Sequence, residues 1–177
     1  MNNIQIIIWL FPKLFIFHDF EEIIFMQPWM NKNRRYLTER FPMLSKKLLP
    51  HLVNITTASF ALGVAEEFIL ISIITVISYV INWYSLWAGL FIAFTLHLVV
   101  HCFQTLIVRK YVPAIITSII CLPICIYIIK HIVQLFTLDT VILYSILGFI
   151  IMVINLGVVH KFMDVFTRCL SKYEHKS

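Results

Sequence analysis

The chain consists of five long apolar stretches separated by shorter polar connections. Each stretch is at least as long as the roughly 20 residues that an α-helix needs to cross the core of a bilayer. An open strand cannot cross lipid, because its backbone groups would lack hydrogen-bond partners, so the stretches predict helices. We therefore expect an all-α membrane protein, a single domain with a bundle of five transmembrane helices. The predicted spans are about 4–27, 52–82, 86–108, 112–135 and 141–167 of residues 1–177.

Charged residues are scarce and unevenly placed. They make up 13% of the chain, against 60% for hydrophobic residues, whereas soluble domains average about 25% charged. Six Lys and Arg residues lie in the connection 28–51, two at positions 109–110 and four beyond position 160, together twelve of the fourteen. By the positive-inside rule, 28–51 is a basic cytoplasmic loop, the N-terminus lies outside and the C-terminus is cytoplasmic. This placement accounts for the net charge of +5 without nucleic acid as a partner.

The first stretch carries a polar cluster, His18-Asp19-Phe20-Glu21-Glu22. A charge at the centre of a membrane helix costs roughly 2.5–3.5 kcal/mol on insertion scales, so these groups need partners. His18, Glu21 and Glu22 stand at i, i+3 and i+4 and therefore share one helix face. Asp19 lies off the His18 face, and we expect it at the membrane interface or beside a lysine.

Three other stretches carry polar residues at a similar depth. In the third stretch, the polar residues recur at i, i+4 and i+7, again on one face. The predicted topology puts all of them near the middle of the membrane or in its inner half, level with the first cluster, so we expect one shared site. The fourth stretch contributes none in its middle. The residues are Glu66 and Glu67 in the second stretch, His97, His101 and Gln104 in the third, and Asn155 and His160 in the fifth.

On a helix, the two carboxylates of the second stretch point in different directions. Ser59, Gly63 and Glu66 share a stripe, and small residues in such a stripe let a neighbouring helix approach closely. Glu66 and Glu67 are about 100° apart around a helix, so we expect only one of them to point fully into the site.

Asn155, in the fifth stretch, fits either the lining of the site or a hydrogen bond between two helices.

Carboxylates and imidazoles gathered at one depth form a ligand set for a divalent transition metal. These ligands suit zinc, iron or manganese, and no cysteine joins them. An ion would also neutralise carboxylates that otherwise repel one another. Helical bundles with such residues hold pairs of ions, so we expect one ion or two. The predicted ligands are His18, Glu22, Glu67, His97, His101 and His160, with Glu21 and Glu66 as catalytic acid or base and Gln104 and Asn155 lining the site.

The cluster at residues 18–22 resembles the motif that names the HXXEE-domain family, small membrane proteins found mainly in bacteria and archaea. That family is also described by a further histidine, for which the third and fifth stretches offer candidates, and by a Tyr-x-Pro-Gly motif. Tyr111-Val112-Pro113-Ala114 is similar to the latter motif, with Ala114 in place of glycine. The resemblance implies the architecture and the position of the site, and it names no reaction.

These observations favour a membrane-embedded, metal-dependent enzyme, a hydrolase or an oxidoreductase, acting on a lipid or another membrane-borne substrate. The same cluster would also serve a small proton- or cation-coupled carrier, for which a homodimer would supply the missing repeat. A structural or regulatory membrane protein, with the loop 28–51 against anionic membrane lipid or a cytosolic partner, is the third alternative. The content of Ile, Phe, Lys and Asn is typical of an AT-rich microbial genome and favours a bacterial plasma membrane.

Overall fold

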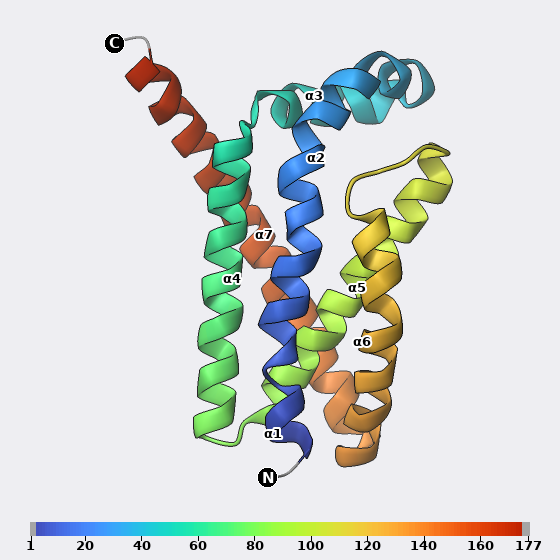
Figure 1. Ribbon diagram of the computed structural model, residues 1–177, viewed down its shortest axis with the longest axis vertical. Coiled ribbons are helices and arrows are strands. Elements are labelled where there is room, and N and C mark those ends of the chain that lie inside the picture. Colours follow the sequence, from blue (N-terminus) through green and yellow to red (C-terminus); the bar gives the residue numbers. More distant parts are fainter. Residues whose placement is uncertain (1–2, 175–177) are drawn as a thin grey trace.

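The computed structural model describes residues 3–174, and within this range its regular elements are all helices. Figure 1 shows the long helices standing side by side as a bundle, with the two chain ends at opposite ends of it. The elements are α1 (Asn3–Ile7), α2 (Leu10–Arg40), α3 (Pro42–Asn54), α4 (Thr57–Val80), α5 (Tyr84–Val108), α6 (Ile115–Leu135) and α7 (Leu138–Glu174).

Four of these helices, α4 to α7, are long and apolar enough to cross a bilayer. Their outward faces carry large apolar side chains, such as Ile69, Ile119 and Leu143, which are 57%, 61% and 63% exposed. Lipid tails are as apolar as these side chains and can cover them. The structure therefore supports the expected all-α, multi-pass membrane protein and accounts for four of the five predicted spans.

The first predicted span is divided into α1 and α2. The chain turns at Ile8–Trp9 before α2 begins, and Pro12, which has no amide hydrogen, fits the first turn of that helix. The polar cluster of α2 points inward, whereas Phe17, Phe20 and Ile24 are 45%, 53% and 58% exposed on its outer face. This apolar outer face favours a membrane position for α2, and its crossing of the bilayer stays a prediction.

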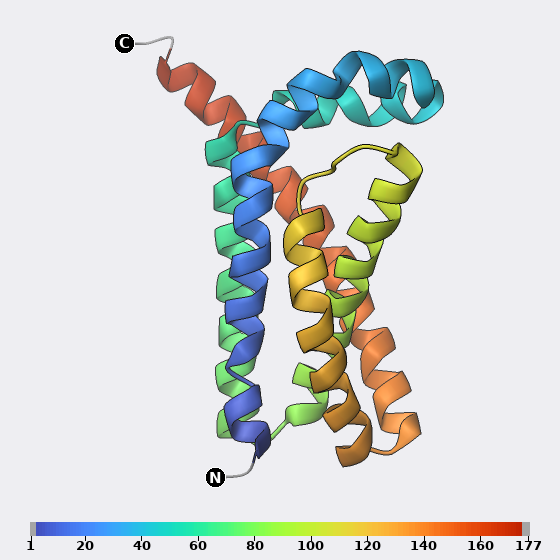
Figure 2. The ribbon, with the colours of Figure 1, turned by 45° about the vertical axis from the view of Figure 1, so that its right-hand side comes forward.

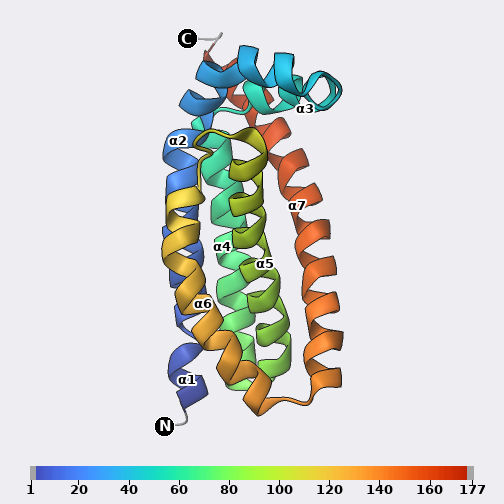
Figure 3. The ribbon, with the colours of Figure 1, turned by 90° about the vertical axis from the view of Figure 1, so that its right-hand side faces the viewer.

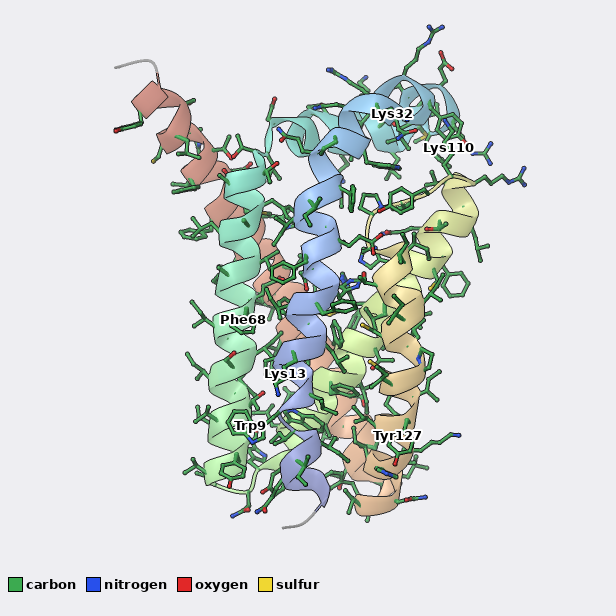
Figure 4. The ribbon with its side chains drawn as sticks, viewed as in Figure 1. Trp9, Lys13, Lys32, Phe68, Lys110 and Tyr127 are labelled. Atoms are coloured by element: carbon green, nitrogen blue, oxygen red, sulfur yellow. The ribbon has the colours of Figure 1, made fainter. Side chains whose placement is uncertain are left out.

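The connection predicted as a loop over 28–51 is largely helical. Pro28 lies inside α2, where a proline kinks a helix, and Figure 2 shows the following part of α2 lying across the end of the bundle with α3. The helix then continues to Arg40, and Pro42 begins α3 at a position that tolerates proline. Lys32 and Lys110 both lie at this end (Figure 4), which we call the basic end of the bundle.

Five helices form a closed ring, in which α2 packs on α4, α4 on α7, α7 on α5, α5 on α6 and α6 on α2. Figure 3 shows α7 on the other side of the bundle from α2 and α6. Figure 1 shows α5 and α7 slanting in opposite directions and crossing. Their backbones touch at Gly89 and Gly148, because a Cβ on Gly89 would lie 3.0 Å from the Cβ of Tyr144 and nearer still to its carbonyl oxygen.

An aromatic cluster fixes α2 against α5 beside the polar residues. The Phe11 ring lies 5.4 Å from Phe91 and 5.6 Å from Phe94, and Trp87 stacks on Phe91 at 5.2 Å between ring centroids. Phe94 also approaches the His18 ring, at 6.0 Å. Such ring pairs contribute about 0.5–1.5 kcal/mol beyond the burial of their area, so the position of His18 relative to α5 is tightly held.

Candidate metal centre

Four side chains from two helices converge in the interior of the bundle. His18 and Glu22 lie one turn apart on α2, and His97 and His101 lie one turn apart on α5. Each offers one nitrogen or oxygen atom, and these atoms all lie within 4.8 Å of one another. His18, Glu22 and His101 are buried, and His97 is half-buried. The structure thus brings together four of the six residues predicted as ligands, which we call the His/Glu group.

The spacing of the His/Glu group fits a shared ion. The His97 Nε2 atom lies 2.9 Å from His101 Nε2, and the latter lies 3.1 Å from the Glu22 Oε1 atom. Two ligand atoms at about 2.0–2.1 Å from one ion are separated by about 2.9–3.4 Å at octahedral or tetrahedral angles. Both distances fall in this range, so Glu22, His97 and His101 are spaced as ligands of one ion would be.

The hydrogen bonds around His18 leave one of its ring nitrogens free to bind a metal. The Thr117 hydroxyl has one proton, and it donates that proton to Glu21 Oε2 at 2.7 Å. Thr117 Oγ1 therefore accepts from His18 Nδ1 at 3.1 Å, which places the His18 proton on Nδ1. His18 Nε2 then carries a lone pair, and it is buried without a hydrogen-bond partner among the described residues. A ring held in one tautomer in this way is typical of a metal ligand.

Glu21 holds the start of α6 instead of facing the His/Glu group. Its Oε2 atom accepts from the backbone N–H and hydroxyl of Thr117, at 2.8 and 2.7 Å, and its Oε1 atom accepts from the hydroxyl of Tyr111 and the N–H of Ile116, at 2.7 and 3.4 Å. A carboxylate has about four lone-pair sites, so all are occupied. Glu21 caps the helix that residue 114 leaves uncapped, where a negative charge is favoured, and this favours a positioning role over the predicted catalytic one.

The stretch similar to Tyr-x-Pro-Gly takes part in this cap. Partial burial and the hydrogen bond to Glu21 raise the pKa of Tyr111, so its phenol stays a donor. Ala114 has a φ of 76°, in the left-handed region, where glycine is the usual residue. The position therefore does require a positive φ, and Ala114 adopts it with its side chain fully buried.

Glu66 and Glu67 point in different directions from α4. The stripe predicted on this helix faces α7, because Ser59 accepts from Thr167 at 2.7 Å and Glu66 accepts from Asn155 at 3.2 Å. Glu66 thus joins two helices away from the His/Glu group, which does not favour its predicted catalytic role. Glu67 lies on the cavity side.

Asp19 was expected at the interface or beside a lysine, and this expectation is wrong. Its side chain is buried, and Oδ2 has no hydrogen-bond partner in the described part of the chain. The inward face of α2 is wide, because α4 and α6 flank it on either side. Asp19 therefore points into the bundle, where the carboxyl groups of Glu22 and Glu67 act on it electrostatically.

A cavity of about 470 Å³ adjoins the His/Glu group, within the usual range for a small-molecule site. Most of its wall is apolar, from Phe11 and Leu90 at one end to Leu37 and Ile55 at the basic end. The described residues of this wall include no Lys or Arg. Its polar members are Asp19, Glu22, Gln27, Thr56, Thr57, Glu67, His97, His101, Gln104, Asn155 and His160.

The remaining predicted site residues line this cavity without joining the His/Glu group. His160 lies on α7, and its Nδ1 atom is 2.9 Å from the carbonyl oxygen of Leu156 in the same helix. Gln104 lies one turn beyond His101 on α5. No sequence pattern indicates Thr117, because its role arises where α2 and α6 meet, although the motif at 111–114 lies in the same segment.

Residues 9–128 match a family model described as a protein of unknown function with HXXEE motif. The match covers more than half of the chain, and the chain therefore belongs to the HXXEE family. No curated protein and no solved structure matches it.

Proposed function

We propose that this protein is a membrane-embedded, metal-dependent enzyme, and that His18, Glu22, His97 and His101 hold its ion. The observation that carries the proposal is the buried, unpartnered Nε2 atom of His18, which lies within 4.8 Å of the ligand atoms of the other three residues. A buried polar atom without a partner costs roughly 1–3 kcal/mol. A bound ion removes that cost and neutralises Glu22.

Three imidazoles and one carboxylate suit zinc, iron or manganese. When bound, such an ion supplies either Lewis-acid chemistry on a carbonyl or bound water, or redox chemistry, and the protein is accordingly a hydrolase or an oxidoreductase. Glu21, Thr117 and Tyr111 act around the ion by holding the His18 ring in its tautomer. Glu21 and Glu66 do not face the His/Glu group, so neither of them is favoured as the group that accepts or donates a proton.

The substrate in this proposal is a lipid-like molecule with an uncharged polar group. The apolar wall of the cavity suits a hydrocarbon chain, and the His/Glu group lies beside it to receive the polar group. The acidic side chains of the wall repel an anionic headgroup, and no described Lys or Arg of the wall would attract one. We place the basic end of the bundle at the cytoplasmic face of a bacterial plasma membrane, from which the site is reached through the inner leaflet.

Metal analysis of the purified chain tests this proposal. The full chain is isolated in nanodiscs without chelators and then loaded separately with Zn²⁺, Fe²⁺ or Mn²⁺. We expect at least about one equivalent of ion, and we expect His97→Ala and His101→Ala to lose it. The control is His131→Ala, because His131 lies on α6 against Tyr127, away from the His/Glu group. Less than about a tenth of an equivalent in the folded wild-type protein would refute metal binding.

A second measurement addresses the substrate. Metal-loaded nanodiscs are supplied with long-chain esters and alcohols or, separately, with fatty acids and anionic phospholipids. We expect turnover, or binding in the cavity, only with the uncharged compounds. Phe94→Ala enlarges the cavity and should shift the preferred chain length. Equal binding of anionic lipids would contradict the proposed substrate class.

A further inference from the structure

We infer that Asp19 and Glu67, together with Glu22, form a second cation site beside the His/Glu group. This inference rests on the proposed metal-binding function and extends it to a pair of ions. Asp19 is 4% exposed, and its Oδ2 atom is buried with no hydrogen-bond partner among the described residues. A buried carboxylate oxygen that no described residue satisfies calls for a further partner.

The geometry of α2 puts Glu22 between the two sites. Glu22 is four residues from His18 and three residues from Asp19, so it neighbours both on the inward face of the helix. One of its oxygens lies 3.1 Å from His101 Nε2, on the side of the first ion. A carboxylate in this position can bridge two ions, as carboxylates do in the dinuclear sites of helical bundles.

Glu67 completes the set from the neighbouring helix. It lies on α4, which packs on α2, and it lines the same cavity as Asp19 and Glu22. Glu22 and Glu67 are the charged groups that act on Asp19. Asp19 and Glu67 lie outside the compact His/Glu group. Their side chains therefore have to move toward the second ion when it binds.

Charge balance distinguishes two ions from one. One divalent ion balances only two of the three carboxylates of Asp19, Glu22 and Glu67. The three imidazoles that bind the first ion are neutral and do not change this balance. No described Lys or Arg of the cavity wall balances the remainder. With a second divalent ion the three carboxylates no longer leave an unbalanced negative charge. Because all protein ligands of this ion are carboxylate oxygens, it is one that prefers oxygen, such as Mn²⁺ or Mg²⁺.

Titration with Mn²⁺ tests the second site. The metal-free full chain in nanodiscs is titrated with Mn²⁺, and free Mn²⁺ is counted by its magnetic resonance signal. We expect the wild-type protein to bind two ions and Asp19→Asn and Glu67→Gln to bind one, with the affinity of the tighter ion kept within about threefold. The matched controls are Asp139→Asn and Glu39→Gln, which change exposed carboxylates outside the cavity and should bind two.

The possible outcomes separate this inference from the proposed function. No bound Mn²⁺ and no other bound ion in the wild-type protein refutes the proposed function. One bound ion in the wild type, unchanged in Asp19→Asn, refutes only the second site, as does a variant that keeps both ions. Thermal unfolding of the metal-free proteins gives an independent reading, since Asp19→Asn removes a buried carboxyl group that is repelled by Glu22 and Glu67. It should raise the unfolding temperature of the metal-free protein and reduce the gain on adding Mn²⁺.

Discussion

Replacing Thr117 with valine removes one hydroxyl and keeps the shape of the side chain. The change breaks the contact from His18 Nδ1 to Thr117 Oγ1, at 3.1 Å, and the contact from that hydroxyl to Glu21, at 2.7 Å. The backbone N–H of Thr117 still donates to Glu21 at 2.8 Å, so α6 stays capped. The perturbation therefore acts on the His18 ring and not on the packing of α2 against α6.

Its magnitude follows from the two functions of the hydroxyl. The loss of a partner that orients a ligating histidine typically lowers metal affinity 10–100-fold, which corresponds to about 1.4–2.8 kcal/mol. In the metal-free protein, the buried N–H of His18 loses its acceptor, at a cost of about 1–3 kcal/mol. We therefore expect Thr117→Val to weaken Zn²⁺ or Mn²⁺ binding by one to two orders of magnitude.

The assay is a competition titration against a chromophoric chelator in nanodiscs. Thr117→Ser keeps the hydroxyl and should stay within about threefold of the wild type. Thr95→Val is the matched control, because the buried hydroxyl of Thr95 donates to the Phe91 carbonyl of its own helix and Thr95 is not part of the His/Glu group. An unchanged affinity in folded Thr117→Val, or an equal loss in Thr117→Ser or Thr95→Val, would refute the role assigned to this hydroxyl.

Three further changes test other parts of the structure. Tyr111 and the backbone amides of α6 donate hydrogen bonds to Glu21, and Glu21→Gln places an amide NH₂ against these donors. We therefore expect a loss of about 1–3 kcal/mol in unfolding free energy, measured by thermal unfolding with and without metal. An unchanged unfolding temperature would contradict the cap. Gly89→Ala forces apart the backbones of α5 and α7 and should cost about 1–3 kcal/mol, whereas Gly157→Ala, which meets nothing within 4 Å, should be neutral or stabilising by up to about 1 kcal/mol; equal effects of the two refute the close contact. A fluorescent protein fused to the C-terminus should be fluorescent and a phosphatase at the same place inactive, because the positive-inside rule places this end in the cytoplasm; the reverse pattern inverts the topology.

Much of the fold could be predicted from the sequence, because the length of an apolar stretch is enough to predict a membrane helix. The stretches predicted at 86–108 and 112–135 coincide closely with α5 and α6. The helical form of 28–40 was missed, because Pro28 and the basic residues resemble the start of a loop. A helix can continue through a proline when it bends away from it, and the basic residues then lie on a helix across the end of the bundle.

The site could be located from helical spacing, but the direction of each side chain could not. His18, Glu22, His97 and His101 meet because pairs four residues apart share a face, and the structure brings these faces together. Their roles as ligands stay a prediction. Whether Glu66 or Glu67 faces the cavity depends on the rotation of α4 about its axis, which is set by the contact of Gly63 with Val159 and Met163. The spacing of polar and apolar residues around Glu67 does not reveal this contact, so it does not indicate which way Glu67 points.

The crossing of α5 and α7 has a mechanical consequence for the cavity. At Gly89 and Gly148 the two helices meet backbone on backbone, so the distance between their axes there cannot shrink and the pair can only pivot. His101 on α5 and Val159 on α7 line the cavity beyond this pivot, toward the basic end. The width of the cavity thus depends on the angle between α5 and α7, which is fixed about two turns of α5 away from His97. We expect substitutions at Gly89 or Gly148 to change the size of the molecule that the cavity admits without changing the polar groups that line it.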